Sequence, residues 1–220
     1  MIGGIDILTV ALFAASLLPA LVLHELSHGI VADRQGDTTP RLSGRLTLNP
    51  ARHIDPFGTV ILPGLLLLPT LFGQATTPVF AYAKPMPFNP QNLKDPDRQT
   101  MWIALAGPLT NLVLAVGGAL LLRVTGREDV LGLFDGPPVP RFLLIFVFVN
   151  VLLAVFNIIP LPPLDGSKVL ARFLPPRARE VYRSWEQYGA LFLLVIFFLF
   201  PGPIFAIVDP IVSGLLDMLL

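Results

Sequence analysis

The sequence has no cysteine and little charge. Of its 220 residues, 54% are hydrophobic and 14% are charged, and no Lys or Arg precedes Arg34. Without cysteine, disulfides and thiolate metal ligands are excluded, so any metal must be held by His, Asp or Glu. The net charge of zero gives no indication of nucleic-acid binding. Because no basic residue comes early, we expect no cleaved signal peptide.

Long apolar runs dominate what is present. The mean hydropathy is +0.72, and several runs approach the roughly 18 residues that a helix needs to cross a bilayer. We therefore predict an all-α polytopic membrane protein with about five to six transmembrane helices. The expected helices cover residues 5–32, 98–124, 141–159, 188–200 and 203–220.

The distribution of basic residues predicts the orientation. Arginine and lysine concentrate in the segments 33–55 and 167–187. Basic loops of membrane proteins face the cytoplasm. We therefore expect a multi-pass protein of the plasma membrane whose N-terminus faces outward. The segment 167–187 also has the amphipathic pattern of a helix at the membrane interface.

The first predicted helix contains His24-Glu25-Leu26-Ser27-His28. Histidines at positions i and i+4 share one face of a helix and can bind one metal ion, and the glutamate between them can act as a general base. Ionisable groups inside a membrane segment are costly and are functional by default. The pattern therefore predicts a metal site with His24 and His28 as ligands and Glu25 as the catalytic residue.

A catalytic zinc ion usually has three protein ligands, so a third must come from elsewhere. Asp165 is a candidate because it follows a predicted helix in a proline-broken stretch. The alternative is that Asp165 caps the next helix, a common role for aspartate. His53 is a further candidate ligand, although a hydrogen bond within its loop fits its sequence context better.

Several motifs together resemble a known family. The stretch Asn157–Gly166, which ends in Leu-Asp-Gly, resembles the second signature of the site-2 proteases, which are intramembrane zinc metalloproteases. The stretch Ala106–Asn111 resembles that family's central-helix motif. The resemblance implies that Zn²⁺ is the cofactor, that His24, His28 and Asp165 are its ligands, and that Glu25 is the base. The short prokaryotic branch without PDZ or CBS domains fits best.

Two asparagines are further candidates for the site. Asn111 lies on a stripe of small residues that suits close helix packing, so it either links helices or places a polar group near the metal. The family resemblance implies that Asn157 binds substrate or the oxyanion, and the alternative is that it caps the proline break. Asn111 and Asn157 are therefore candidate substrate-binding or oxyanion residues.

Prolines shape the remaining segments. The chain has 23 prolines, which membrane proteins tolerate mainly where protein or water satisfies the backbone. The segment 56–73 is expected to form either a re-entrant hairpin or a span with an extended return, and residues 76–97 to be extended near the active site. An extended segment there could bind substrate as an added strand. We expect a single domain over 1–220, with a catalytic core at about 5–175 and C-terminal helices at about 188–220.

Three functions follow from these patterns. The first is an intramembrane zinc metalloendopeptidase that cuts in or near transmembrane segments of other proteins, with its active site toward the cytoplasm. The second is a zinc-binding membrane carrier or sensor, which would not need Glu25. The third is an inactive scaffold that binds membrane helices. The intact His-Glu-His pattern favours the first.

Overall fold

The computed structural model describes residues 7–61, 83–125, 137–199 and 201–220, and within these ranges the structure is helical, with no strand. Its long helices are α1 (Ile7–Arg34), α4 (Pro96–Val124), α5 (Pro138–Asn157), α8 (Glu186–Leu199) and α9 (Pro201–Leu219). Its short helices are α2 (Thr39–Leu42), α6 (Asp165–Ala171) and α7 (Pro176–Ser184). Single turns occur at η1 (Pro50–Arg52), η2 (Pro56–Ile61) and η3 (Pro90–Asn92).

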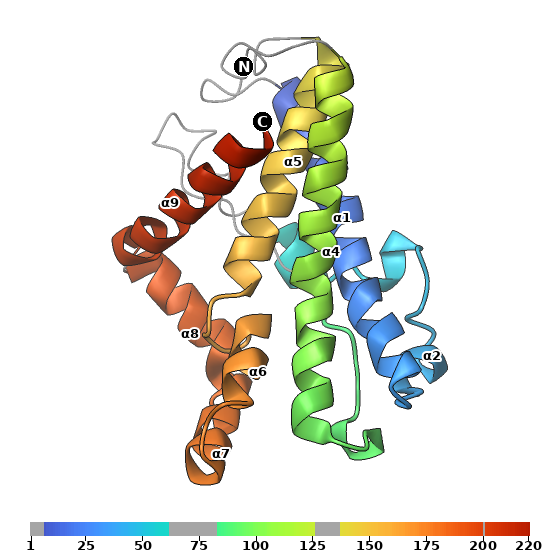
Figure 1. The fold of residues 1–220 in the computed structure, drawn as a ribbon, viewed down its shortest axis with the longest axis vertical. Helices are drawn as coiled ribbons and strands as arrows, with labels where there is room; N and C mark the ends of the chain where they lie inside the picture. Colours follow the sequence, from blue (N-terminus) through green and yellow to red (C-terminus); the bar gives the residue numbers. More distant parts are fainter. Residues whose placement is uncertain (1–6, 62–82, 126–136, 200) are drawn as a thin grey trace.

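Helices α1, α4 and α5 form the centre of the molecule and pack against one another (Figure 1). Asp95 caps α4 by accepting the N–H of Arg98, and Pro96 opens the helix where its missing N–H costs nothing. The predicted stripe of small residues on α4 is buried: Ala104, Gly107, Asn111, Ala115 and Gly118. A Cβ on Gly118 would lie 3.0 Å from Val147 of α5. The small residues therefore let α4 approach its neighbours closely.

Four of the described helices are long and apolar enough to cross a membrane: Leu8–Arg34, Pro96–Val124, Pro138–Asn157 and Gly202–Leu219. The prediction of an all-α membrane protein is confirmed, and the expected count of about five to six is compatible with this number. Of the segment 56–73, residues 56–61 form the π-helical turn η2. The rest of the expected re-entrant hairpin lies outside the described residues, as do residues 76–82.

The C-terminal helices form an arm beside the central bundle (Figure 1). The expected amphipathic segment 167–187 is divided between α6 and α7, and Pro175 and Pro176 begin the second of these helices. Helix α9 returns against α5, where Val208 and Val212 join a buried cluster with Val147 and Val151. The arm is therefore connected to the centre by apolar packing near the C-terminus and by the α5–α6 loop.

Asp37 links the segment after α1 to the segment before α4. Its carboxylate is fully buried and accepts hydrogen bonds from the backbone N–H of Asn89 at 2.6 Å and the amide of Asn92 at 2.7 Å. The carboxylate also accepts the hydroxyl of Thr39 at 2.6 Å. These bonds hold residues 89–92, part of the segment that was expected to be extended near the active site, beside the end of α1. Residues 90–92 form the turn η3.

Candidate metal centre

His24 and His28 lie one turn apart on the same face of α1, as their spacing predicts. Their ring centroids are 4.7 Å apart in an edge-to-face arrangement, and the residues are only 4% and 6% exposed. Glu25 is half-buried beside them. One ligating atom from each of His24, Glu25 and His28 lies within 4.8 Å of the others.

Asp165 faces this histidine pair from another part of the chain. Its Oδ2 atom is 3.1 Å from Nε2 of His24 and 3.1 Å from Nε2 of His28. Asp165 is the first residue of α6, whose N-cap is Leu164. The alternative that Asp165 is the helix N-cap is therefore wrong, and its side chain points to the histidines.

The second nitrogen of each imidazole has a hydrogen-bond acceptor. Nδ1 of His24 lies 2.5 Å from Oδ1 of Asn111, and Nδ1 of His28 lies 2.6 Å from the carbonyl oxygen of Ile103. Both partners accept hydrogen bonds, so each Nδ1 carries a proton and donates it. In a neutral imidazole this leaves the lone pair of Nε2 directed at Asp165.

The donor set fits a zinc ion. Two Nε2 lone pairs and a carboxylate oxygen repel one another unless a cation lies between them. Zinc–ligand distances of about 2.0–2.1 Å in a tetrahedron separate neighbouring ligand atoms by about 3.4 Å, close to the 3.1 Å between Asp165 and each histidine. Zinc-bound histidines typically donate their other nitrogen to an acceptor, as His24 and His28 do here.

Asn111 is itself held by a neighbouring asparagine. It is fully buried, and its amide donates to Oδ1 of Asn150 on α5 at 2.8 Å. The amide of Asn150 in turn donates to the carbonyl of Phe146 at 2.8 Å. Because the amide N–H of Asn111 donates to Asn150, the amide oxygen of Asn111 faces His24. Asn111 therefore lies beside the histidine pair and also links α4 to α5.

Gly107 brings the backbone of α4 against the two imidazoles. A Cβ at this position would lie 2.5 Å from Nε2 of His24 and 2.5 Å from Nε2 of His28. Real Cβ atoms do not approach other atoms so closely, so no side chain fits here. The sequence pattern suggested only helix packing for this glycine, and its contact with the histidines was not predicted.

Glu25 contacts the extended segment before α4. Its Oε2 atom accepts the backbone N–H of Met86 at 2.6 Å. Arg45 donates to the carbonyl of Lys84 at 2.7 Å and so holds the same segment. Burial lowers the pKa of Arg45, and attraction to Glu25 opposes that effect. Glu25 therefore lies between the two histidines and a fixed stretch of backbone.

Lys168 contacts the second oxygen of Asp165. Its Nζ lies 3.3 Å from Oδ1, so Oδ2 alone is left to face the histidines. Burial raises the pKa of the Asp165 carboxyl, and the positive charge of Lys168 opposes that effect. Lys168 therefore favours the ionised carboxylate, the form that a metal ligand must have. The sequence analysis did not predict this contact, although Lys168 follows Asp165 by three residues, a spacing that lets two side chains of a helix meet.

The other candidate residues lie apart from this cluster. His53 is buried and its Nε2 lies 2.8 Å from the carbonyl oxygen of Thr47, so the loop hydrogen bond is confirmed and His53 is not part of the metal-ligating group. The amide of Asn157 donates to the carbonyl of Leu153 in its own helix at 2.9 Å. Its role with substrate stays a prediction. The backbone groups of Ile103 and Met86 were missed, because a backbone contact leaves no residue pattern.

A metal-ligating cluster buried among helices of membrane length is typical of an intramembrane metalloprotease. The chain belongs to peptidase family M50, the site-2 protease family, which it matches over residues 12–131 and 134–200. This confirms the family resemblance seen in the motifs, the enzyme class and the multi-pass membrane character.

Individual relatives are similar over most of the chain. "Putative zinc metalloprotease YwhC" of Bacillus subtilis is 37% identical over 185 residues, which cover 83% of this chain and 78% of YwhC. "Putative zinc metalloprotease Rip2" of Mycobacterium tuberculosis is 32% identical over 187 residues, which cover 83% of this chain. The aligned part spans 65% of Rip2, just under two thirds of its length. No solved structure matches the chain.

Proposed function

We propose that the protein is an intramembrane zinc endopeptidase whose metal is held by His24, His28 and Asp165. The observation that carries this proposal is the position of Asp165 Oδ2, 3.1 Å from Nε2 of both histidines. Three protein ligands leave the fourth position of zinc for water or substrate, as in catalytic sites. The names of the relatives, which describe zinc metalloproteases, support zinc as the metal.

Glu25 acts as the general base in this proposal. Zinc, when bound, supplies Lewis-acid polarisation of a water molecule and of the scissile carbonyl. Glu25 accepts a proton from the water that attacks the carbonyl and delivers it to the leaving amine as the peptide bond breaks. Its place beside the histidines, with its ligating atom within 4.8 Å of theirs, supports this role.

Asn111 and the carbonyl of Ile103 orient the two histidines for metal binding. Each accepts the Nδ1 proton of one imidazole and so keeps Nε2 unprotonated. We assign Asn111 to this orienting role, because its oxygen is 2.5 Å from Nδ1 of His24. Asn157 is kept as the candidate for contact with substrate or the oxyanion.

The substrates are membrane proteins, and we propose that cleavage occurs in or near their transmembrane segments on the cytoplasmic side. Helices α2 and α7 lie at the same end of the molecule (Figure 1). The segments at this end include Arg41, Arg45, Arg179 and Arg183. A basic end of this kind faces the cytoplasm under the positive-inside rule. Helix α6, which begins at Asp165, is followed in the chain by α7 at this end.

The test measures zinc and proteolysis in the same purified variants. We expect about one zinc per chain in the wild type and in Glu25→Gln, and lost or sharply weakened zinc binding in His24→Ala and Asp165→Ala. Glu25→Gln should lose cleavage of transmembrane segments fused to a reporter, because the amide cannot accept the proton. Zinc retained in Asp165→Ala would contradict the ligand set. Full cleavage by Glu25→Gln would contradict the role of Glu25 as general base. It would not favour the alternatives of a zinc carrier or an inactive scaffold, since neither of them cleaves peptides.

A further inference from the structure

The loop between α5 and α6, residues 158–164, determines where Asp165 lies. This loop folds back over the start of α6, where a Cβ on Gly166 would be 2.1 Å from the carbonyl oxygen of Ile158. Within the loop, the N–H of Leu164 donates to the carbonyl of Leu161 at 2.9 Å. Asp165 follows the loop without an intervening residue, so the path of the loop determines where its backbone begins α6.

Residues 182–189, where α7 ends and α8 begins, form an elbow that contacts this loop from the other side. The hydroxyl of Tyr182 donates a hydrogen bond to the carbonyl of Pro160. A Cβ on Gly189 would lie 2.7 Å from the backbone N of Pro163 and 2.8 Å from the carbonyl carbon of Pro162. The atoms in the way belong to backbone, so the loop itself would have to move to make room for a side chain. Gly189 thus permits direct contact between α8 and the loop.

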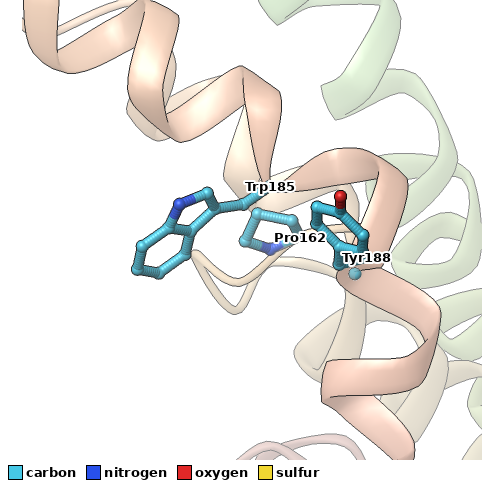
Figure 2. A pocket seen from close by; sticks show the side chains of 4 residues that line it. Pro162, Trp185 and Tyr188 are labelled. Carbon is cyan, nitrogen blue, oxygen red and sulfur yellow. The ribbon is translucent and has the colours of Figure 1, made fainter.

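Aromatic rings complete the contact. Figure 2 shows Pro162 between Trp185 and Tyr188, which belong to the same elbow. These three residues and Gly189 line an apolar cavity of about 250 Å³. Trp185 and Tyr188 are 54% and 63% exposed. The two rings therefore lie on the surface of the protein, on either side of Pro162.

We propose that Tyr182, Trp185 and Gly189 are positioning residues that fix the metal ligand Asp165 by clasping residues 160–163. This inference rests on the proposed function, since it requires Asp165 to bind the metal. Metal sites lose affinity when a ligand shifts by a fraction of an ångström, and residues that orient ligands are worth roughly 10–100-fold in affinity. The C-terminal arm thereby gains a defined role in building the metal centre.

Simple packing or membrane anchoring by the elbow leads to a different expectation. Amphipathic helices with exposed aromatic residues anchor proteins at the membrane interface. An anchor of that kind would change overall stability when altered, but not the affinity or geometry of a metal site. Metal affinity and metal spectroscopy in the full-length protein therefore separate the two roles.

The first experiment compares Gly189→Ala with Gly214→Ala. Gly214 lies in α9, and a Cβ there meets nothing within 4 Å, which makes it the matched control. Both variants are purified in detergent, and Co²⁺ affinity is measured by competition with a chelator, together with the visible spectrum of bound Co²⁺. We expect Gly189→Ala to bind Co²⁺ about tenfold or more weakly, with an altered spectrum. Gly214→Ala should match the wild type.

Tyr182→Phe provides a second variant that leaves the backbone unobstructed. It removes only the hydroxyl that donates to Pro160. We expect a smaller loss of Co²⁺ affinity in the same direction. Wild-type affinity and spectrum in both Tyr182→Phe and Gly189→Ala would overturn the proposal.

A double-mutant cycle with Asp165→Ala shows whether the elbow acts through Asp165. If it does, Gly189→Ala should cause no further loss of Co²⁺ affinity once Asp165 is gone. An equal loss in both backgrounds would show a general structural effect and contradict the proposal. Asp165→Ala that binds Co²⁺ as the wild type does would instead refute the proposed ligand set. The two failures are therefore distinct.

Discussion

The two histidines are oriented by acceptors of different kinds. His28 depends on a backbone carbonyl, that of Ile103, whereas His24 depends on the side chain of Asn111. A backbone acceptor is independent of the side chain at its position, but a side-chain acceptor can be removed by one substitution. The orientation of His24 is therefore the part of the site that mutation can test cleanly.

We expect Asn111→Ala to weaken zinc binding by roughly 10–100-fold without removing a ligand. The substitution leaves Nδ1 of His24 without its acceptor and Asn150 without the amide that donates to it at 2.8 Å. Zinc affinity measured by chelator competition tests this expectation. An unchanged affinity in Asn111→Ala would show that His24 holds its tautomer without help.

Asn157→Ala is the matched comparison. The amide of Asn157 donates to a carbonyl of its own helix, so its loss leaves the groups around the histidines in place. We expect wild-type zinc affinity together with reduced cleavage of a transmembrane reporter substrate, if Asn157 contacts substrate or the oxyanion. Wild-type cleavage would leave Asn157 with a purely structural role near the proline break.

Asp37 makes stability depend on pH. Burial raises the pKa of its carboxyl, but hydrogen bonds from Thr39, Asn92 and Asn89 outweigh burial and keep the pKa below its ordinary value. A carboxyl with a lowered folded-state pKa stabilises the protein above its unfolded pKa. That contribution is lost as the pH falls through the folded-state value. The relevant window therefore begins near pH 4, the ordinary value for aspartate, and extends below it.

We expect Asp37→Asn to lower the free energy of unfolding at pH 7 by about 2 kcal/mol, because several hydrogen bonds to a charged acceptor are weakened. The difference from the wild type should shrink as the pH falls below about 4. Thermal unfolding in detergent at a series of pH values measures it, and the titration of other groups cancels in the comparison. A difference that stays constant down to pH 3 would contradict this account.

At the scale of single elements, α4 packs directly against the histidines of α1 at Gly107. Gly107→Ala would place a methyl group 2.5 Å from both Nε2 atoms. We expect this variant to lose most of its zinc, because either the imidazoles or the whole helix must move. Gly117 lies on the same helix, and a Cβ there meets nothing within 4 Å.

Gly117→Ala is therefore the control for the general effect of replacing glycine in a helix. It should keep its zinc and unfold at an equal or slightly higher temperature, since alanine is the better helix former. Zinc content and unfolding temperature of the two variants provide the comparison. Equal zinc in Gly107→Ala and Gly117→Ala would mean that α4 does not approach the histidines as closely as the structure indicates.

The helices themselves were largely predictable from sequence. Apolar runs gave the first helix as residues 5–32 and the helix after the proline-rich segment as 98–124, compared with Ile7–Arg34 and Pro96–Val124 in the structure. Length and apolar character decide these elements, and both can be read directly from the residues. The division of residues 167–187 into α6 and α7 was missed, although Pro175 and Pro176 offered a signal.

The grouping of the candidate side chains was predictable from sequence, while their roles stay predictions. His24, Glu25 and His28 followed from helical spacing, and Asp165 from its proline-broken context and the family resemblance. The carbonyl of Ile103, the N–H of Met86 and the contact of Gly107 with the histidines were not predictable. Each of these is a backbone position set by the packing of distant segments, and packing has no local signature in the sequence.

At the scale of the whole molecule, charge and the path of α4 predict which end faces the cytoplasm. The end with α2 and α7 includes Arg41 and Arg183, whereas α4 rises from this end to Thr125 at the other (Figure 1). Because the protein has no cysteine, single cysteines can report on each end without a background signal. Thr125 and Ser184 are both exposed and lie at opposite ends of the bundle.

We expect Thr125→Cys to react with a membrane-impermeant maleimide in intact cells, and Ser184→Cys to react only after permeabilisation. The basic segment around Ser184 favours the cytoplasm under the positive-inside rule, and a helix as long as α4 places Thr125 across the bilayer. The unsubstituted protein should not react under either condition. The reverse labelling pattern would contradict the proposal that the active site faces the cytoplasm. Labelling of both positions from the same side would mean that α4 does not cross the membrane.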